Sequence, residues 1–283
     1  MLYLLLASSI VGITVQEVTN KEYNKRVSGG TFTFAAFSTL FALVVFLLSS
    51  GGKLEFSLSY VLYSICFAVF YSVTIVCTFL AIANGPLSIT GLISKYSLLI
   101  PTLYGIIFLD EPQSYMFYIG LCLLVISLLL INYEGKKNEK KLSLKWGIFI
   151  IIAFITNGGC SVLQKVQQLR FKGEGKSEFM IVALIVSFLI MFIVALIFER
   201  KDLGKNIKSR PYCFIVCGFA NGIVNLFVML LAAWPASVVF PVISAGGVIL
   251  TALIGIVVYK EKLSELQIIG LVLGIACVVI FNV

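Results

Sequence analysis

Lys95 stands near the middle of an apolar stretch that runs from residue 86 to residue 109. A helix rises ~1.5 Å per residue, so this stretch is long enough to cross the ~30 Å hydrocarbon layer of a membrane. A lysine at mid-membrane costs roughly 2.5 to 3.5 kcal/mol on insertion scales, so it should face a cavity or a partner. All 13 acidic residues fall in or beside the predicted loops, which leaves no mid-span carboxylate to pair with it. We predict that Lys95 faces a central cavity, where it contacts an anionic group of a ligand or controls the entry of that ligand. The alternative is a hydrated lysine held by serine and carbonyl oxygens.

The composition defines the class of protein. With 60% hydrophobic residues over 283 positions and a mean hydropathy of +1.08, the chain is too apolar for a soluble domain. Its net charge of +8 does not indicate a nucleic-acid partner, because 20 of the 21 Lys and Arg lie in predicted inter-helix loops or at span ends. No basic region precedes the first apolar run and no cleavage site follows it, so we expect this run to remain in the mature protein. The sequence predicts a multi-pass protein of the plasma or bacterial inner membrane.

The usual constellations of an enzyme are missing. The chain has no His, and its seven Cys lie inside apolar segments without CxxC spacing. Without His, mid-span carboxylates or paired Cys, neither a nucleophilic centre nor a metal site is predicted. A phosphate-binding loop for ATP is absent as well. We therefore expect no enzymatic activity, no cofactor and no metal.

Ten apolar segments can be drawn, and helices are the only plausible way for them to span a membrane. In hydrocarbon every backbone polar group must be satisfied within its own segment, and the alternation of a β-barrel is absent. The fold class expected is all-α, with ten transmembrane helices. The predicted segments are residues 2–19, 31–49, 57–81, 86–109, 114–132, 145–164, 178–198, 211–232, 235–259 and 264–282.

The two halves of the chain resemble each other at a fixed offset of 150 residues. Glu111 matches Glu261 in this register, and Gly105 and Gly120 match Gly255 and Gly270. We predict two five-helix repeats, residues 1–133 and 145–283, joined by a basic linker at 134–144. Because five is odd, the second repeat enters the membrane inverted. Inverted repeats are a recurrent plan of transporters, which bind substrate near the midplane.

Polar side chains recur three and four positions apart in the first, third, fourth, sixth, eighth and ninth segments, so they share one helix face. The first three of these segments correspond to the last three under the repeat. We therefore predict a central cavity built by both halves. The alternative is that these groups only join helices to one another. The predicted substrate-binding residues are Lys95, Ser64, Tyr71, Ser88, Asn157, Gln164, Asn221, Asn225, Trp234 and Ser244.

Glycine and proline inside the spans predict bends and close packing. Pro101, Pro241 and the pair Gly246 and Gly247 should weaken the fourth and ninth helices, either for packing or for the rocking that alternating access requires. Gly270 and Gly274 form a GxxxG pattern in the last segment. This pattern predicts close helix packing, inside one chain or across a homodimer.

Each half ends with a helix, an acidic corner and an apolar helix that carries glycine. The corners read LDEPQS at 109–114 and YKEKLS at 259–264. This arrangement resembles the EamA-type ten-helix carriers of the drug/metabolite transporter superfamily. The resemblance implies a cavity formed by helices 1, 3, 4, 6, 8 and 9, and a role for Lys95 like that of the intramembrane lysines which hold anionic groups in related carriers. The corner residues Glu111 and Glu261 are expected to bond helix ends and fix the hairpin.

We therefore predict a secondary active or facilitative transporter of a small organic metabolite that works by alternating access. Its expected partners are membrane lipid and the small-molecule substrate, with no nucleic acid. A channel or a non-transporting membrane sensor of the same fold is the alternative. Saturable flux with counterflow would favour the carrier.

Overall fold

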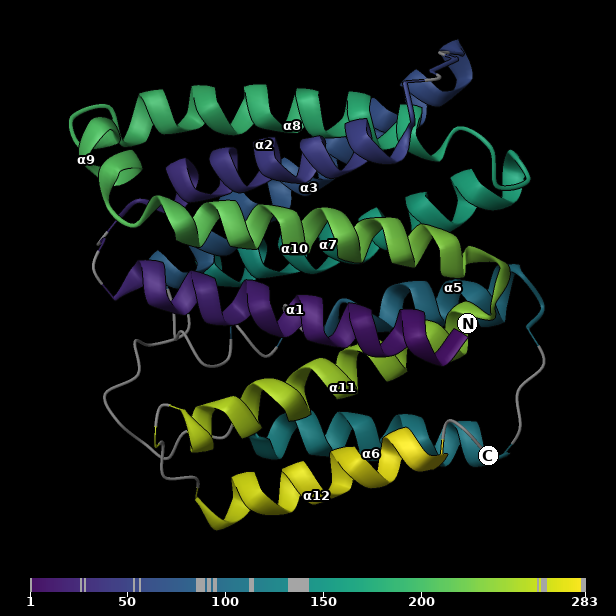
Figure 1. Cartoon of the computed structure of the whole chain (residues 1–283). Coiled ribbons are helices and arrows are strands. Elements are labelled where there is room, and N and C mark those ends of the chain that lie inside the picture. Colours follow the sequence, from purple (N-terminus) through teal and green to yellow (C-terminus); the bar gives the residue numbers. More distant parts are fainter. Residues whose placement is uncertain are drawn as a thin grey trace. The chain divides into compact units, whose positions relative to one another are not determined.

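The computed structural model consists almost entirely of helices, and no strand occurs among the residues that it describes (Figure 1). It describes the chain except residues 1, 26, 28, 53, 56, 85–89, 91–92, 94–95, 112–114, 132–142, 259, 261–263 and 281–283. The elements are α1 (Leu2–Asn24), α2 (Thr31–Ser49), α3 (Leu58–Asn84), α5 (Leu99–Phe108), α6 (Tyr115–Ile131), α7 (Leu144–Arg170), α8 (Lys176–Phe198), α9 (Leu203–Lys208), α10 (Pro211–Leu230), the 3-10 turn η1 (Leu231–Ala233), α11 (Ala236–Val257) and α12 (Glu265–Ile280).

Every predicted apolar segment contains a helix. Seven of the described helices, α1, α2, α3, α7, α8, α10 and α11, are long and apolar enough to cross a membrane. The other apolar helices, α5, α6 and α12, are shorter within the described residues, so the count of ten spans stays a prediction. The boundaries of α2 agree with the prediction, whereas α1 and α7 continue beyond it to Asn24 and Arg170. The short helix α9 was not predicted.

The chain forms two compact units, and each unit combines segments from both halves of the sequence. Unit 1 consists of Met1–Ile75 and Leu163–Ala233, and unit 2 of Val76–Val162 and Trp234–Val283. Helices α3 and α7 each contribute to both units. The division into the repeats 1–133 and 145–283 is a statement about sequence similarity, and it stays a prediction.

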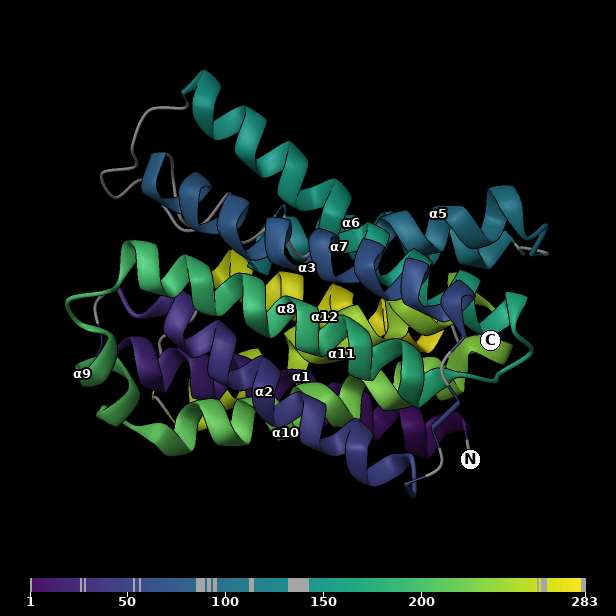
Figure 2. The same ribbon diagram turned by 90° about the horizontal axis from the view of Figure 1, so that it is seen from above.

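In unit 1, α2 packs against α8 and α10, and α10 also packs against α1 (Figures 1 and 2). The contact with α2 depends on two glycines one helical turn apart. A Cβ at Gly218 would lie 2.4 Å from the carbonyl oxygen of Ser38, and one at Gly222 would lie 2.8 Å from Cβ of Val45. This is the close approach that small residues permit between membrane helices.

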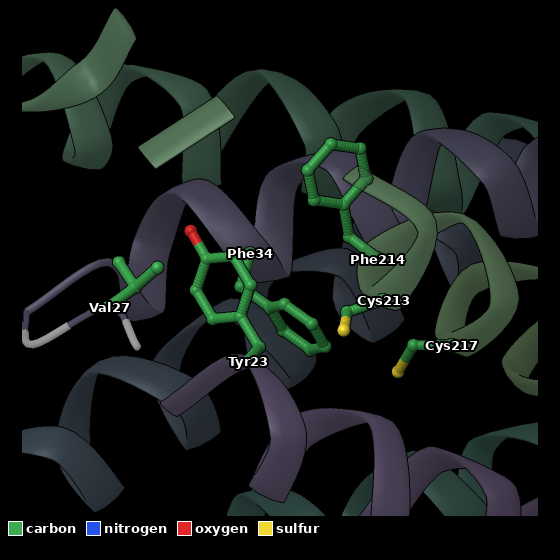
Figure 3. Close-up of a cluster of buried hydrophobic side chains, with 6 residues drawn as sticks. All are labelled: Tyr23, Val27, Phe34, Cys213, Phe214 and Cys217. Atoms are coloured by element: carbon green, nitrogen blue, oxygen red, sulfur yellow. The ribbon is translucent and has the colours of Figure 1, made fainter. Parts of the chain in front are cut away.

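An aromatic cluster joins the end of α1 to the start of α10 in the same unit (Figure 3). Tyr23 is fully buried, with its ring centroid 4.8 Å from that of Phe34. Its hydroxyl donates a hydrogen bond to the carbonyl oxygen of Asn206, at 3.1 Å. Outside this cluster, Arg210 donates to the Glu22 carboxylate at 2.7 Å, and this bond raises the pKa of the guanidinium. Together these contacts fix the ends of α1 and α10.

In unit 2, α6 and α12 are joined by two reciprocal hydrogen bonds. Ser127 Oγ donates to the carbonyl oxygen of Gly270 at 2.6 Å, and Cys277 Sγ donates to that of Gly120 at 3.2 Å. Residues 127 and 277, like residues 120 and 270, are 150 positions apart, so each bond repeats the other with the two halves exchanged. A Cβ at Gly274 would lie 2.8 Å from Ser127 Oγ, so the predicted GxxxG pattern serves packing within this chain.

Two glutamates cap the N-termini of helices that cannot cap themselves. The residues that precede α2 and α11, Gly30 and Pro235, offer no side-chain cap. Instead, Glu199 accepts hydrogen bonds from the backbone N–H groups of Phe32 and Thr33 at 2.8 and 2.9 Å, and from Thr33 Oγ1 at 2.5 Å. Carboxylates at this place satisfy orphan N–H groups and complement the helix dipole.

Glu111 does the same for α11 in unit 2. It accepts from the N–H groups of Ala236 and Ser237 at 2.8 and 2.9 Å, and from Ser237 Oγ at 2.7 Å. Gly105 leaves room for it, because a Cβ there would lie 2.5 Å from Glu111 Oε2. Glu111 thus bonds a helix end, as expected, but that end belongs to a helix more than a hundred residues away in sequence. Its expected role in fixing its own hairpin stays a prediction. Glu261 lies outside the described residues.

We expect Glu199→Gln to lower the thermal unfolding midpoint of the purified protein. The amide keeps the size of the carboxylate, but its NH₂ group would face backbone donors and its charge is lost. Leaving buried donors unsatisfied costs about 1 to 3 kcal/mol. Glu174→Gln, at an exposed position, is the matched control and should leave the midpoint unchanged. Equal midpoints for the two variants would show that the Glu199 cap contributes nothing to stability.

Candidate functional site

The last two turns of α7 are polar and buried, which is unusual for the end of an apolar helix. Gln164, Lys165, Gln167 and Gln168 are each at most 6% exposed. The sequence prediction ended this span at residue 164 and placed Lys165 at its edge. The helix continues instead to Arg170, because neither glycine nor proline occurs between residues 164 and 170, and Lys165 is buried in its last turns. These side chains must therefore find polar partners inside unit 1.

Gln164 bonds a carboxamide of α10, which is linked in turn to a carboxamide of α1. Gln164 Nε2 donates to Asn225 Oδ1 at 2.7 Å, and it also lies 3.8 Å from the sulfur of Met180 on α8. Asn225 Nδ2 donates to the backbone and side-chain oxygens of Asn221, at 2.8 and 3.1 Å. Asn221 Nδ2 in turn donates to Gln16 Oε1 at 2.9 Å. We call these four residues, Gln16, Asn221, Asn225 and Gln164, the carboxamide cluster.

The local reason for this arrangement is helical spacing. Asn221 and Asn225 are one turn apart on α10, so both amides lie on the face that receives α1 and α7. Close packing of α1 on α10 helps, because Gly12 has no side chain where a Cβ would lie 2.4 Å from Val224 Cγ2. The cluster is thus positioned by three helices that are distant in sequence.

All four side chains of the cluster are uncharged, and each can both donate and accept hydrogen bonds. Each carboxamide carries an N–H₂ donor and a carbonyl acceptor with two lone pairs, so these internal bonds leave hydrogen-bonding capacity unused. Gln164 is buried, whereas the other three members are only half-buried. Such groups can bind a solute that both donates and accepts hydrogen bonds. They would hold it without the desolvation cost of a buried charge.

Other predicted site residues of unit 1 have different surroundings. Ser64 is fully buried, and its hydroxyl bonds the carbonyl oxygens of Tyr60 and Phe179 at 2.8 Å each, which ties α3 to α8. Tyr71 is half-buried and stacked against Phe67, with ring centroids 6.1 Å apart. These contacts are made outside the carboxamide cluster.

The predicted residues of unit 2 form separate contacts. Asn157 Nδ2 donates to Ser97 Oγ at 2.6 Å, beside the turn that precedes α5. Ser244 is buried one turn after Pro241 on α11. Trp234 is 47% exposed. Lys95 and Ser88 lie outside the described residues.

The predicted bends have different outcomes. Pro101 lies in the first turn of α5, just after the turn at residues 97–98, so its missing N–H group leaves no bond unmade. Helix α11 continues through Pro241, and through Gly246 and Gly247 as well.

Three of the four cluster members are among the predicted substrate-binding residues, and the fourth, Gln16, belongs to the polar face of the first predicted segment. The prediction missed the buried residues Lys165, Gln167 and Gln168. The run QKVQQ at 164–168 keeps helical spacing and could have indicated them, but its low hydropathy predicts that the span ends there.

Comparison with known proteins gives the family. The sequence profile of the family described as "Sugar transport protein" matches residues 3–283. A solved structure titled "Crystal structure of protein" superposes with a TM-score of 0.78 at 12% identity, over 98% of this chain and 94% of that chain, which shows a shared fold. No curated protein matches the sequence significantly. Because the profile covers almost the whole sequence, this chain belongs to the sugar transport protein family and is a multi-pass membrane transporter of small molecules.

Proposed function

We propose that the protein carries a small polyhydroxylated solute, of the sugar class, and that the carboxamide cluster contacts its hydroxyl groups. The observation that carries this proposal is the chain of amide hydrogen bonds from Gln164 through Asn225 and Asn221 to Gln16. The family match gives independent support for a sugar-like substrate.

The match between amides and sugars is chemical. A sugar hydroxyl is at once a donor and an acceptor, and so is a carboxamide, which can therefore replace the water that the hydroxyl loses on binding. Neutral partners suit alternating access, because the carboxamide cluster itself then buries no uncompensated charge when the site is empty and closed. A charged cluster would bind more tightly but would be costly to occlude without substrate.

The transport mechanism proposed is alternating access in a fold of two inverted five-helix repeats, as in EamA-type carriers. Support comes from the reciprocal bonds of Ser127 with Gly270 and of Cys277 with Gly120, which exchange residues 150 positions apart. Inverted repeats give a carrier two related states, because each half can take the conformation of the other. The turn before α5 and the glycine pair Gly246 and Gly247 in α11 are the proposed hinges.

The test is transport by the purified protein in proteoliposomes, with a panel of labelled neutral and acidic sugars. A carrier gives saturable uptake of at least one sugar, and unlabelled sugar inside the vesicles accelerates entry by counterflow. A channel gives flux proportional to the gradient without counterflow. Uptake of no sugar in the panel, by protein that is folded in the vesicles, would count against the proposed substrate class.

For Lys95 we retain the proposal that it contacts an acidic group of the substrate. Lys95→Ala should then weaken the apparent affinity for an acidic sugar at least about tenfold, because a charge-assisted bond contributes about 1.5 to 3 kcal/mol. The affinity for the neutral parent sugar should be unchanged. Lys95→Arg should restore only part of the loss, since the two cations differ in shape. Equal effects on both sugars would remove Lys95 from contact with an acid.

A further inference from the structure

A pocket lies where three apolar helices of unit 1 end. The helices are α7, α8 and α10 with its extension η1, so the pocket is at the depth of a membrane surface rather than its centre. Its volume is about 250 Å³. It is lined by Gln168, Leu169, Lys172, Gly173, Lys176, Met229, Leu230, Ala232 and Ala233.

The turn that carries the two lysines is fixed by its own bonds. After α7 the chain enters the left-handed region at Lys172 and Gly173, with φ of 51° and 84°. The N–H group of Gly173 bonds the carbonyl oxygen of Gln168 at 2.9 Å, which is the long bond of a Schellman motif. The chain then returns within three residues to Lys176, at the first position of α8.

Aromatic packing holds the same turn from the other side. Phe171 meets the rings of Tyr60 and Tyr63 edge-on, with centroids 4.7 and 5.9 Å apart. Gly175, with φ of 65°, lets the turn pass close to Tyr60, because a Cβ there would lie 2.7 Å from the ring. Gln168, which lines the pocket, is 4% exposed and donates a hydrogen bond to Gln167 Oε1. Gln167 in turn donates to the carbonyl oxygen of Glu174 in the turn. The ammonium groups of Lys172 and Lys176 are thus carried on a preorganised frame.

The lining has one polar side and one apolar side. Lys172 is exposed and Lys176 half-buried, and no carboxylate lines the pocket, although Glu174 belongs to the same turn. Neither lysine forms an ion pair within the parts of the chain that the structure describes. The remaining wall is formed by Leu169, Met229, Leu230 and the two alanines of η1. A ligand that suits it has an anionic head and an apolar portion.

We propose that this pocket binds an anionic phospholipid, with its phosphate between Lys172 and Lys176 and the start of an acyl chain against Met229 and Leu230. Lysine binds phosphate as a point charge, and the N-terminus of α8 beside Lys176 adds its positive dipole end. Basic pockets between membrane helices at the surface are suited to such head groups. The site is separate from the carboxamide cluster and does not depend on the proposed substrate.

The experiment titrates phosphatidylglycerol onto the detergent-purified full chain and measures bound lipid by native mass spectrometry and the unfolding midpoint by thermal shift. Parallel arms use phosphatidylcholine and inorganic phosphate. The wild type should bind one phosphatidylglycerol in preference to phosphatidylcholine and be stabilised by it. In the double variant Lys172→Gln with Lys176→Gln, binding of this lipid should weaken at least about tenfold.

The matched control is Lys201→Gln with Lys205→Gln, which removes the same charge from exposed positions that are not part of this pocket's lining. It should bind phosphatidylglycerol as the wild type does. Unchanged lipid binding in the pocket variant would overturn the proposal. The proposal would also be overturned if the pocket variant had a lower unfolding midpoint in every lipid but the same lipid preference as the wild type. The lysines would then only neutralise the carbonyl end of α10. Equal protection by millimolar inorganic phosphate would overturn the lipid assignment.

Discussion

Asn225→Ala is expected to reduce sugar uptake about 10- to 100-fold while the protein remains inserted and folded. Asn225 is the centre of the carboxamide cluster, since it accepts from Gln164 and donates twice to Asn221. Its removal deprives the substrate of one amide and releases its neighbours from their fixed orientation. A lost hydrogen bond with an unsatisfied partner costs about 1 to 3 kcal/mol, and 1.4 kcal/mol corresponds to a factor of ten.

The measurement is initial uptake by proteoliposomes that contain equal amounts of protein, with the unfolding midpoint recorded beside it. Asn24→Ala is the matched control, because Asn24 is an exposed asparagine whose amide bonds Asn20 on its own helix, at 2.8 Å. The control should transport normally. If Asn225→Ala keeps the uptake and apparent affinity of the wild type, the carboxamide cluster is a structural bond between helices and the proposed site is elsewhere.

The positions of the helices could be predicted because they depend on local chemistry. An apolar run of about 20 residues must form a helix in a membrane, whatever its neighbours are, and α2 begins and ends where its run does. The predicted end of α7, at residue 164, is too early because that prediction also depends on local hydropathy alone. Hydropathy measures the preference of a residue for lipid, and the QKVQQ run is shielded by protein instead. A local measure cannot register this difference.

The candidate site was predicted only in part, because a polar stripe does not specify its partner. Ser64 and Asn225 have the same kind of helical spacing in the sequence. In the structure the Ser64 hydroxyl is used by the backbone of α8, whereas Asn225 joins a cluster of amides that keep spare capacity. The difference lies in Phe179 and Gln164, which are contributed by other helices. The sequence predicts which face of a helix is polar. The packing of the other helices determines whether that face contacts a neighbouring helix or a solute.

The capping glutamates illustrate the same limit. Both lie just after the end of a helix, where a local role at that end was the simplest expectation for Glu111. Gly30 precedes α2 and Pro235 precedes α11, and neither residue has a side chain that can cap a helix. This lack of a local cap is visible in the sequence. Which distant carboxylate supplies the cap was not visible, because the pairing depends on how the helices pack within each unit.

The largest effect on stability is expected from Gly218→Ala. At this position on α10 the added Cβ would lie 2.4 Å from the carbonyl oxygen of Ser38 and 2.5 Å from Cβ of Phe41. Both are atoms of the α2 framework rather than the ends of flexible side chains, so α10 and α2 must move apart. Overpacking of this kind costs about 1 to 3 kcal/mol, and occasionally more. Moving the helices apart would also remove the close contact of Gly222, one turn further along the same face, with α2.

Gly147→Ala supplies the control for this substitution. Gly147 is inside α7, and nothing lies within 4 Å of the position that its Cβ would take. Alanine is favoured over glycine in a helix by about 1 kcal/mol, so this variant should unfold at the same temperature as the wild type or higher. Gly218→Ala gains the same helical preference and should nevertheless unfold at a lower temperature, with less protein recovered from the membrane. If both variants are stabilised alike, α10 and α2 do not approach as closely as these distances require, because the two substitutions differ only in what the new methyl group meets.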